Sequence, residues 1–197
     1  MYYIREDEEQ RYGRDKSTIV NQSYIESGEY RRKFDELTKS PKLNRLIYNM
    51  AKKMLFHRSG TKFEDMCWID METEKVICCK FDEHKTQTIQ MTDTISKKLS
   101  KYNQIIPIHT HPSSLPPSPA DFNCMLQSGY AFGIVLCHDG TIFTYSSYRK
   151  IDGGLWDIYT EKFMQRGIDM YDAQIAALNK FEDSGDIEYE EVKANEI

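Results

Sequence analysis

The 197-residue sequence lacks the features that would assign it to a membrane, secreted or nucleic-acid-binding class. Its longest apolar run, Ala131 to Cys137, is far shorter than the roughly 20 residues that a membrane-spanning helix needs. The first ten residues hold no apolar segment of the kind found in signal peptides. The net charge of −5 argues against duplex nucleic acid as the main partner. We therefore expect a cytoplasmic protein that binds neither a membrane nor nucleic acid.

The sequence also lacks any C-x-x-C pair, which makes a structural zinc cluster unfavoured. Its cysteine number is odd, and most of the cysteines lie inside or beside apolar runs. Such residues behave as small hydrophobic side chains in a reducing compartment. We expect buried free thiols at all five positions: Cys67, Cys78, Cys79, Cys124 and Cys137.

One segment carries most of the functional information, and it runs from His109 to Asp121. Two histidines alternate at the end of the apolar run 105–108, and residues i and i+2 of a strand point to the same face. His109 and His111 would therefore present two imidazoles side by side. Asp121 can add a carboxylate oxygen, and two histidines with one carboxylate and an open position are typical of catalytic zinc.

The segment resembles the motif of the JAMM/MPN+ metalloproteases, which is a distant Glu, then His-Ser/Thr-His-Pro, then Ser-x-x-Asp. The matching parts are His109-Thr110-His111-Pro112 and Ser118-Pro119-Ala120-Asp121. Residues 112–117 form the intervening loop, which is one residue shorter than is usual in the family. The resemblance implies that His109, His111 and Asp121 hold Zn²⁺ and that Ser118 stabilises the oxyanion.

The resemblance also implies an upstream Glu that acts as general base and then as general acid. Glu64 precedes the apolar run 66–69, as the family's Glu precedes a strand, and it is the preferred candidate. Glu72 and Glu74 fall in a predicted hairpin turn, and Glu83 follows a strand end. A carboxylate suits this role because the group must take up a proton and release it.

Simpler interpretations exist for each part of the motif. His-x-His on an edge strand can be two surface imidazoles. Ser118, Pro119 and Asp121 also follow the ordinary order of a helix start, with a capping Ser, a Pro at the first position and an early acid. The combination of these parts after a buried strand favours the metal site.

The pattern of the whole chain predicts an α/β (α+β) fold of JAMM/MPN type, with a curved mixed sheet packed between helices. We expect a polar mobile arm over 1–22, the JAMM-like domain over 23–150, and a helical extension over 151–197 that ends in a solvated acidic tail. The basic residues of the second helix, Arg58 among them, could line a basic groove but more often form only the solvated face of such a helix. The expected helices are 27–38, 41–58, 92–102, 119–129 and 153–182, and the expected strands are 63–71, 76–81, 86–91, 104–109, 131–137 and 141–146.

The function that these features predict is that of a zinc-dependent peptidase or isopeptidase. Its substrate would be a protein or peptide, such as a ubiquitin-like conjugate. Residues 57–65 and the motif are also loosely similar to JAMM proteins of phages and bacterial mobile elements. The alternative is a binding or assembly protein on the same fold, with a non-catalytic metal and with terminal helices that bind a partner or a second copy. A DNA-associated role like that of RadC-type proteins is a weaker option, because the chain is acidic.

Overall fold

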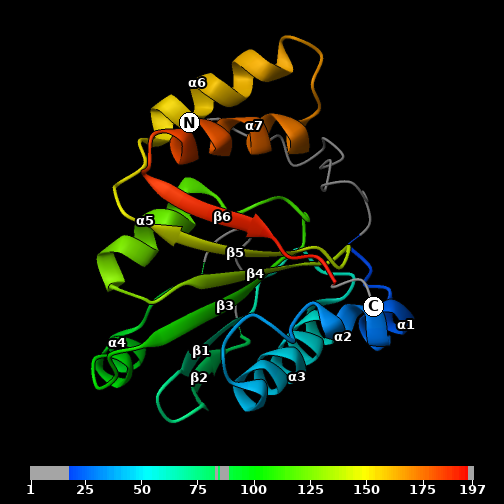
Figure 1. Ribbon diagram of the computed structural model, residues 1–197, viewed down its shortest axis with the longest axis vertical. Helices are drawn as coiled ribbons and strands as arrows, with labels where there is room; N and C mark the ends of the chain where they lie inside the picture. Colours follow the sequence, from blue (N-terminus) through cyan, green and yellow to red (C-terminus); the bar gives the residue numbers. More distant parts are fainter. Residues whose placement is uncertain (1–17, 83, 85–88, 195–197) are drawn as a thin grey trace.

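The computed structural model describes residues 18–82, 84 and 89–194, and it shows a mixed α/β fold with a six-stranded sheet (Figure 1). The α/β class predicted from the sequence is therefore confirmed. The elements in chain order are α1 (Gln22–Ile25), α2 (Gly28–Arg32), α3 (Pro41–Arg58), β1 (Met66–Asp70), β2 (Lys75–Lys80), α4 (Asp93–Leu99), β3 (Ile105–His111), α5 (Pro119–Ser128), β4 (Gly133–Cys137), β5 (Ile142–Ser147), α6 (Gly153–Met164), α7 (Met170–Asp183) and β6 (Ile187–Glu191).

The strands lie in the order β2-β1-β3-β4-β5-β6, with the pair β3 and β4 parallel and the other neighbours antiparallel. The parallel pair requires a crossover, and α5 provides it. β3 is buried along its whole length in the middle of the sheet. The strand that carries the histidine pair is therefore held on both sides by neighbours.

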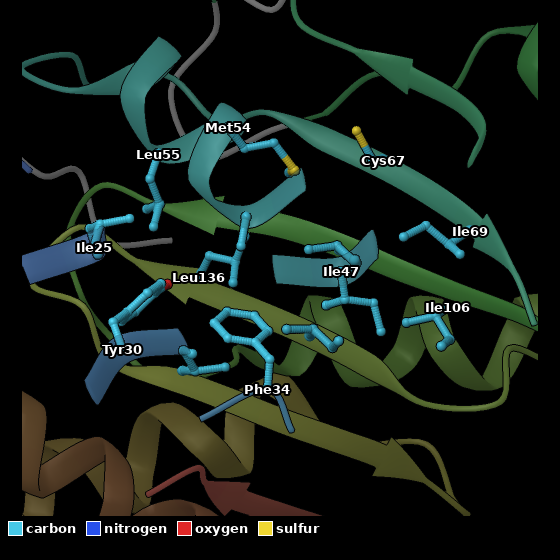
Figure 2. Close-up of a cluster of buried hydrophobic side chains, with 14 of the residues drawn as sticks. Ile25, Tyr30, Phe34, Ile47, Met54, Leu55, Cys67, Ile69, Ile106 and Leu136 are labelled. Atoms are coloured by element: carbon cyan, nitrogen blue, oxygen red, sulfur yellow. The ribbon is translucent and has the colours of Figure 1, made fainter. Parts of the chain in front are cut away.

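One face of the sheet is covered by α1, α2 and α3, which bury an apolar layer against it (Figure 1). The layer includes Ile47 of α3 together with Ile106 and Ile108 of β3, and Figure 2 shows its side chains gathered between helix and sheet. The N-terminus of α3 has the predicted form, because the Ser40 hydroxyl accepts from the Leu43 amide and Pro41 occupies the first turn. We call this side of the sheet the α3 face.

The opposite face, which we call the histidine face, packs against α4, α5 and the pair α6 and α7. Period-two alternation along β3 sends Ile105, Pro107, His109 and His111 to this side. Gly133 of β4 lies opposite Tyr145 of β5, and a Cβ atom there would fall 2.3 Å from the tyrosine ring. A glycine is thus required at position 133 for Tyr145 to cross the strand toward His109.

Several predicted elements differ from the structure. The helix expected at 27–38 is shorter, because α2 ends at Arg32 and turns follow. Residues 89–91 form no strand, and residues 86–88 of the expected strand lie outside the described residues. The helix expected over 153–182 is two helices, α6 and α7.

Both terminal segments are more closely joined to the domain than expected. Val20 is buried, and the Thr18 carbonyl accepts from the Gly60 amide, so residues 18–22 do not belong to a mobile arm. Residues 1–17 lie outside the described residues. The acidic tail is not wholly solvated, because β6 pairs with β5 and buries Ile187 while Glu188 and Glu190 stay exposed.

The expectation of five free thiols is wrong for two of them, since Cys67 and Cys79 form a disulfide. The antiparallel register places Cys67 directly opposite Cys79, with Cα atoms 4.0 Å apart. Cys78, Cys124 and Cys137 are free, and of these only Cys137 is buried. The disulfide removes the basis for inferring a reducing compartment. Within the described part of the chain, no helix combines the length and apolar content needed to cross a bilayer.

Candidate metal centre

Two elements that meet on the histidine face build the candidate centre. β3 ends with His109 and His111, and α5 begins at Pro119, so that Asp121 lies in its first turn. Both histidines are buried and Asp121 is partly buried. The structure thus brings together the three residues that the motif predicts as ligands, and this group could hold a metal ion.

The three side chains direct their ligand atoms toward one another. The two Nε2 atoms are 3.0 Å apart, His109 Nε2 is 3.2 Å from Asp121 Oδ1, and His111 Nε2 is 3.7 Å from Asp121 Oδ2. Tetrahedral coordination with bonds of about 2.0–2.1 Å separates neighbouring ligand atoms by about 3.3 Å. The two separations from His109 Nε2 lie close to that value, and the three residues each offer a ligand atom within 4.8 Å of the others, so the group could hold a single ion.

The tautomer of His111 follows from its second ring nitrogen. His111 Nδ1 lies 2.9 Å from the carbonyl oxygen of Leu115, which can only accept a hydrogen bond. Nδ1 must therefore carry the proton, and in the neutral ring Nε2 presents its lone pair to the centre. Such support of the outer nitrogen is the usual arrangement for a metal-binding histidine.

The shortened loop between the motif halves closes through a tight turn. The Ser114 amide donates to the His111 carbonyl, and Ser114 adopts a left-handed backbone with φ of 52°. The turn brings Leu115 back over His111. One residue fewer in the loop therefore does not prevent Asp121 from reaching the histidines.

Ser118 and Asp121 combine a helix cap with orientation of the carboxylate. The amide and the hydroxyl of Ser118 both donate to Asp121 Oδ2, each at 2.7 Å. Oδ1 is left facing His109. The helix-start interpretation of these residues and their placement in the centre are thus both realised. The Ser118 hydroxyl, however, is directed at Asp121 rather than at an open position.

The charge state of Asp121 suits a ligand. Burial alone would raise its pKa, but the charge and hydrogen bond of His109, the charge of His111 and the Ser118 amide hold the pKa well below its usual range. The carboxylate therefore stays ionised at all physiological pH values. An ionised carboxylate beside two imidazole nitrogens is a donor set for a divalent cation.

Glu64 lies at the edge of this centre. The antiparallel register pairs Met66 with His109. Continuing this register two residues beyond the start of β1 places Glu64 opposite His111, on the histidine face. Burial raises the pKa of Glu64 from 4.5 to about 7, with a lowering effect from His111 and a raising effect from Asp121. Its carboxyl can therefore bind or release a proton near neutral pH.

The other candidate glutamates lie elsewhere or outside the description. Glu72 is exposed in the β1–β2 turn. Glu74 pairs with Lys42 at 2.7 Å and accepts from Ser40, at the start of α3. Glu83 lies outside the described residues. Among the described candidates, only Glu64 is electrostatically linked to His111 and Asp121.

A buried ionic cluster lies beside Glu64 and was not predicted from the sequence. Asp65 is fully buried and contacts Arg58, which is 4% exposed and therefore does not belong to the solvated basic face expected for α3. His57 contacts the same carboxylate from a more exposed position. The sequence offered two signals for this cluster: Asp65 directly follows the candidate base, and the basic pair His57 and Arg58 lies eight and seven residues before Asp65.

Two further groups surround the histidines. His138 is buried behind the motif loop, where its amide donates to the His111 carbonyl and its Nδ1 lies 2.7 Å from the Thr18 carbonyl. The Tyr145 ring meets His109 edge-on, with centroids 6.2 Å apart. Among the described residues His109 Nδ1 has no hydrogen-bond partner, so this ring lacks the support at its outer nitrogen that His111 has.

Comparisons of the chain with protein-family models, with curated proteins and with solved structures gave no match. The case for a function therefore rests on the residues of the centre and on their geometry.

Proposed function

We propose that this chain is a zinc-dependent peptidase or isopeptidase of the JAMM class. The observation that carries the proposal is the convergence of two imidazole nitrogens and one ionised carboxylate beside a carboxyl group with a pKa of about 7. A site built only for structure needs no proton-transfer group at its edge.

The donor types favour zinc over the harder cations. Two imidazoles and one carboxylate are typical of catalytic zinc sites, whereas magnesium and calcium prefer oxygen ligands throughout. His109, His111 and Asp121 supply three ligands, which leaves one tetrahedral position for water or substrate. This arrangement distinguishes catalytic zinc sites from closed structural ones.

Residues of the centre would have separate roles in hydrolysis. Zinc held there would supply Lewis-acid polarisation of the scissile carbonyl and would lower the pKa of a water molecule. Glu64 would accept a proton from the attacking water and return it to the leaving amine. Ser118 would keep the Asp121 carboxylate in place through its amide. Its hydroxyl would turn toward the developing oxyanion when Asp121 is bound to zinc.

The proposed substrate is a protein or peptide whose amide or isopeptide bond enters beside Glu64, such as a ubiquitin-like conjugate. The resemblance of residues 108–121 to the JAMM motif supports this class. A hydrolysis product with a free lysine side chain would identify an isopeptide, and a new α-amino terminus would identify a linear peptide bond.

Metal content is the first test. Purified wild type and the H109A/H111A double variant would be compared by elemental mass spectrometry after zinc reconstitution and removal of excess metal. We expect about one zinc per chain in the wild type and none in the double variant. C124A, which removes a thiol on the exposed side of α5, serves as the control and should keep its zinc.

A wild type that binds no zinc under these conditions would overturn the proposal. A wild type that binds zinc but cleaves neither linear nor isopeptide-linked peptides would favour the binding or assembly function instead. An E64Q variant with full zinc and unchanged peptidase activity would exclude Glu64 as the proton-transfer group and would overturn the proposed mechanism.

A further inference from the structure

We propose that Asp65, held by Arg58, is a positioning residue that fixes Glu64 against the metal centre. The inference rests on the proposed function, because it assigns Glu64 a reaction to be positioned for. It concerns residues that do not belong to the ligand set and that the JAMM motif does not include.

The side chain of Asp65 is anchored at both carboxylate oxygens. Arg58 donates from Nε to Oδ1 at 2.5 Å, and His57 Nδ1 lies 2.7 Å from Oδ2. Arg58 also donates from Nη2 to the carbonyl of Phe81, at the end of β2. The cluster therefore joins the C-terminal end of α3 to the residue just before β1 and to the residue just after β2.

The backbone of Asp65 is bound just as fully, and its partner is Thr110, the residue between the two histidines. The Thr110 amide donates to the Asp65 carbonyl at 3.0 Å, and the Asp65 amide donates to the Thr110 hydroxyl at 2.9 Å. Every polar group of Asp65 is thus used, and two of them connect it directly to the ligand strand.

Glu64 itself has no comparable support. It precedes β1 in a segment without regular structure, and no described side chain forms a hydrogen bond with its carboxyl group. Its orientation therefore depends on the peptide that it shares with Asp65. A displacement of about 1 Å in a catalytic group can lower a rate by two orders of magnitude, so such support matters.

The burial of the Arg58–Asp65 pair indicates a role beyond stabilising the fold. A buried ion pair is often no more stabilising than apolar side chains of similar volume, because both charges lose their hydration. The planar guanidinium of Arg58 can bind Asp65 and Phe81 in fixed directions, which an apolar side chain cannot. A positioning residue must fix the orientation of the group that it supports.

A double-mutant cycle tests the proposal on the 197-residue chain loaded with zinc. The variants are D65A, E64Q and D65A/E64Q, with E74Q as the control, because Glu74 links the opposite end of α3 to the same hairpin. We expect D65A to lower kcat about 10- to 100-fold with KM and zinc affinity unchanged. The double variant should be no slower than E64Q alone, and E74Q should match the wild type.

A second readout does not depend on activity. In D65A, hydrogen exchange of the Thr110 amide should rise at least tenfold relative to E74Q. If D65A destabilises the fold, R58M/D65L replaces the pair with apolar side chains and should fold while still lowering kcat.

Unchanged kcat in D65A, or losses that multiply fully with those of E64Q, would overturn the positioning role. An unchanged hydrogen-exchange rate of the Thr110 amide in D65A would also overturn the positioning role, even if the wild type had no activity. Absence of zinc or of activity in the wild type would count against the proposed function. Failure of the positioning role would be seen only in the comparison of D65A with the wild type, so the two failures are distinguishable.

Discussion

The two faces of the sheet are built from alternate residues of the same strand and yet differ in kind. On the α3 face, Ile106 and Ile108 pack against Ile47 in a continuous apolar layer. On the histidine face, the intervening residues of β3 end in His109 and His111, beneath the first turn of α5. Both faces are buried, but only the histidine face carries the candidate ligand atoms, whereas the α3 side holds the ionic pair of Arg58 and Asp65.

The difference shows how the molecule separates stability from chemistry. The apolar α3 face contributes burial free energy without placing any ligand atom. The histidine face carries polar groups that need fixed partners, and it has them in the Leu115 carbonyl and the Ser118 cap. Changes on the two faces should therefore have different consequences, and four predictions test this.

The largest effect should come from the candidate base. We expect E64Q to lower kcat by about 10²- to 10⁴-fold, because general acid and base transfer contributes roughly that factor. Zinc content should stay at the wild-type level, since Glu64 is not in the ligand set. E72Q, which alters an exposed carboxylate in the same hairpin, is the matched control. Equal rates for E64Q and E72Q would remove Glu64 from the mechanism.

Core truncations should separate the two faces directly. I47A and F122A each remove a fully buried side chain and should each cost about 2–5 kcal/mol of unfolding free energy. Only F122A should also weaken zinc binding, because Phe122 follows Asp121 and packs on Tyr145, which meets His109. Urea unfolding and competition with a chelator measure the two quantities. Equal zinc affinity in both variants would contradict the separation.

His138 should make the stability of the fold sensitive to acid. Burial lowers the pKa of His138 from 6.5 to about 4, with further lowering from His111 and Arg58 and a raising effect from the Thr18 carbonyl. Between these values the unfolded chain binds a proton that the folded chain does not. His138 should therefore lower stability progressively as pH falls from about 6.5 to about 4, by up to about 3 kcal/mol.

The measurement is urea unfolding of the metal-free protein at pH 7.0 and pH 5.0, for the wild type and H138Q. H138Q should lose less stability between the two pH values than the wild type. A difference of the opposite sign would mean that His138 is protonated in the folded state.

The smallest effect should come from the cap of α5. S118A removes one of the two hydrogen bonds to Asp121 Oδ2, and we expect about 0.5–2 kcal/mol of lost stability. Zinc affinity should fall about 10- to 100-fold, as is usual for the partner of a ligand. S40A, which removes the corresponding cap of α3, should lose similar stability without any change in zinc affinity.

The elements with strong local signals were predicted well. The helix at 41–58 is confirmed from its cap to its last residue, and so are the hairpin of β1 and β2 and the strand that ends in the histidines. The pairing of Cys67 with Cys79 and the inclusion of β6 in the sheet were not predicted. The first depends on the register within the predicted hairpin and the second on which strand becomes the neighbour of β6, and a single strand specifies neither.

The candidate centre divides in the same way. The identity and spacing of His109, His111 and Asp121 can be read from the chain alone, because i, i+2 alternation and a helix start are local properties. The convergence of the three side chains, the approach of Glu64 to His111, and the burial of Arg58 against Asp65 come from the folded structure. These facts arise from strand register and from helix packing between residues far apart in the chain, which no local pattern specifies.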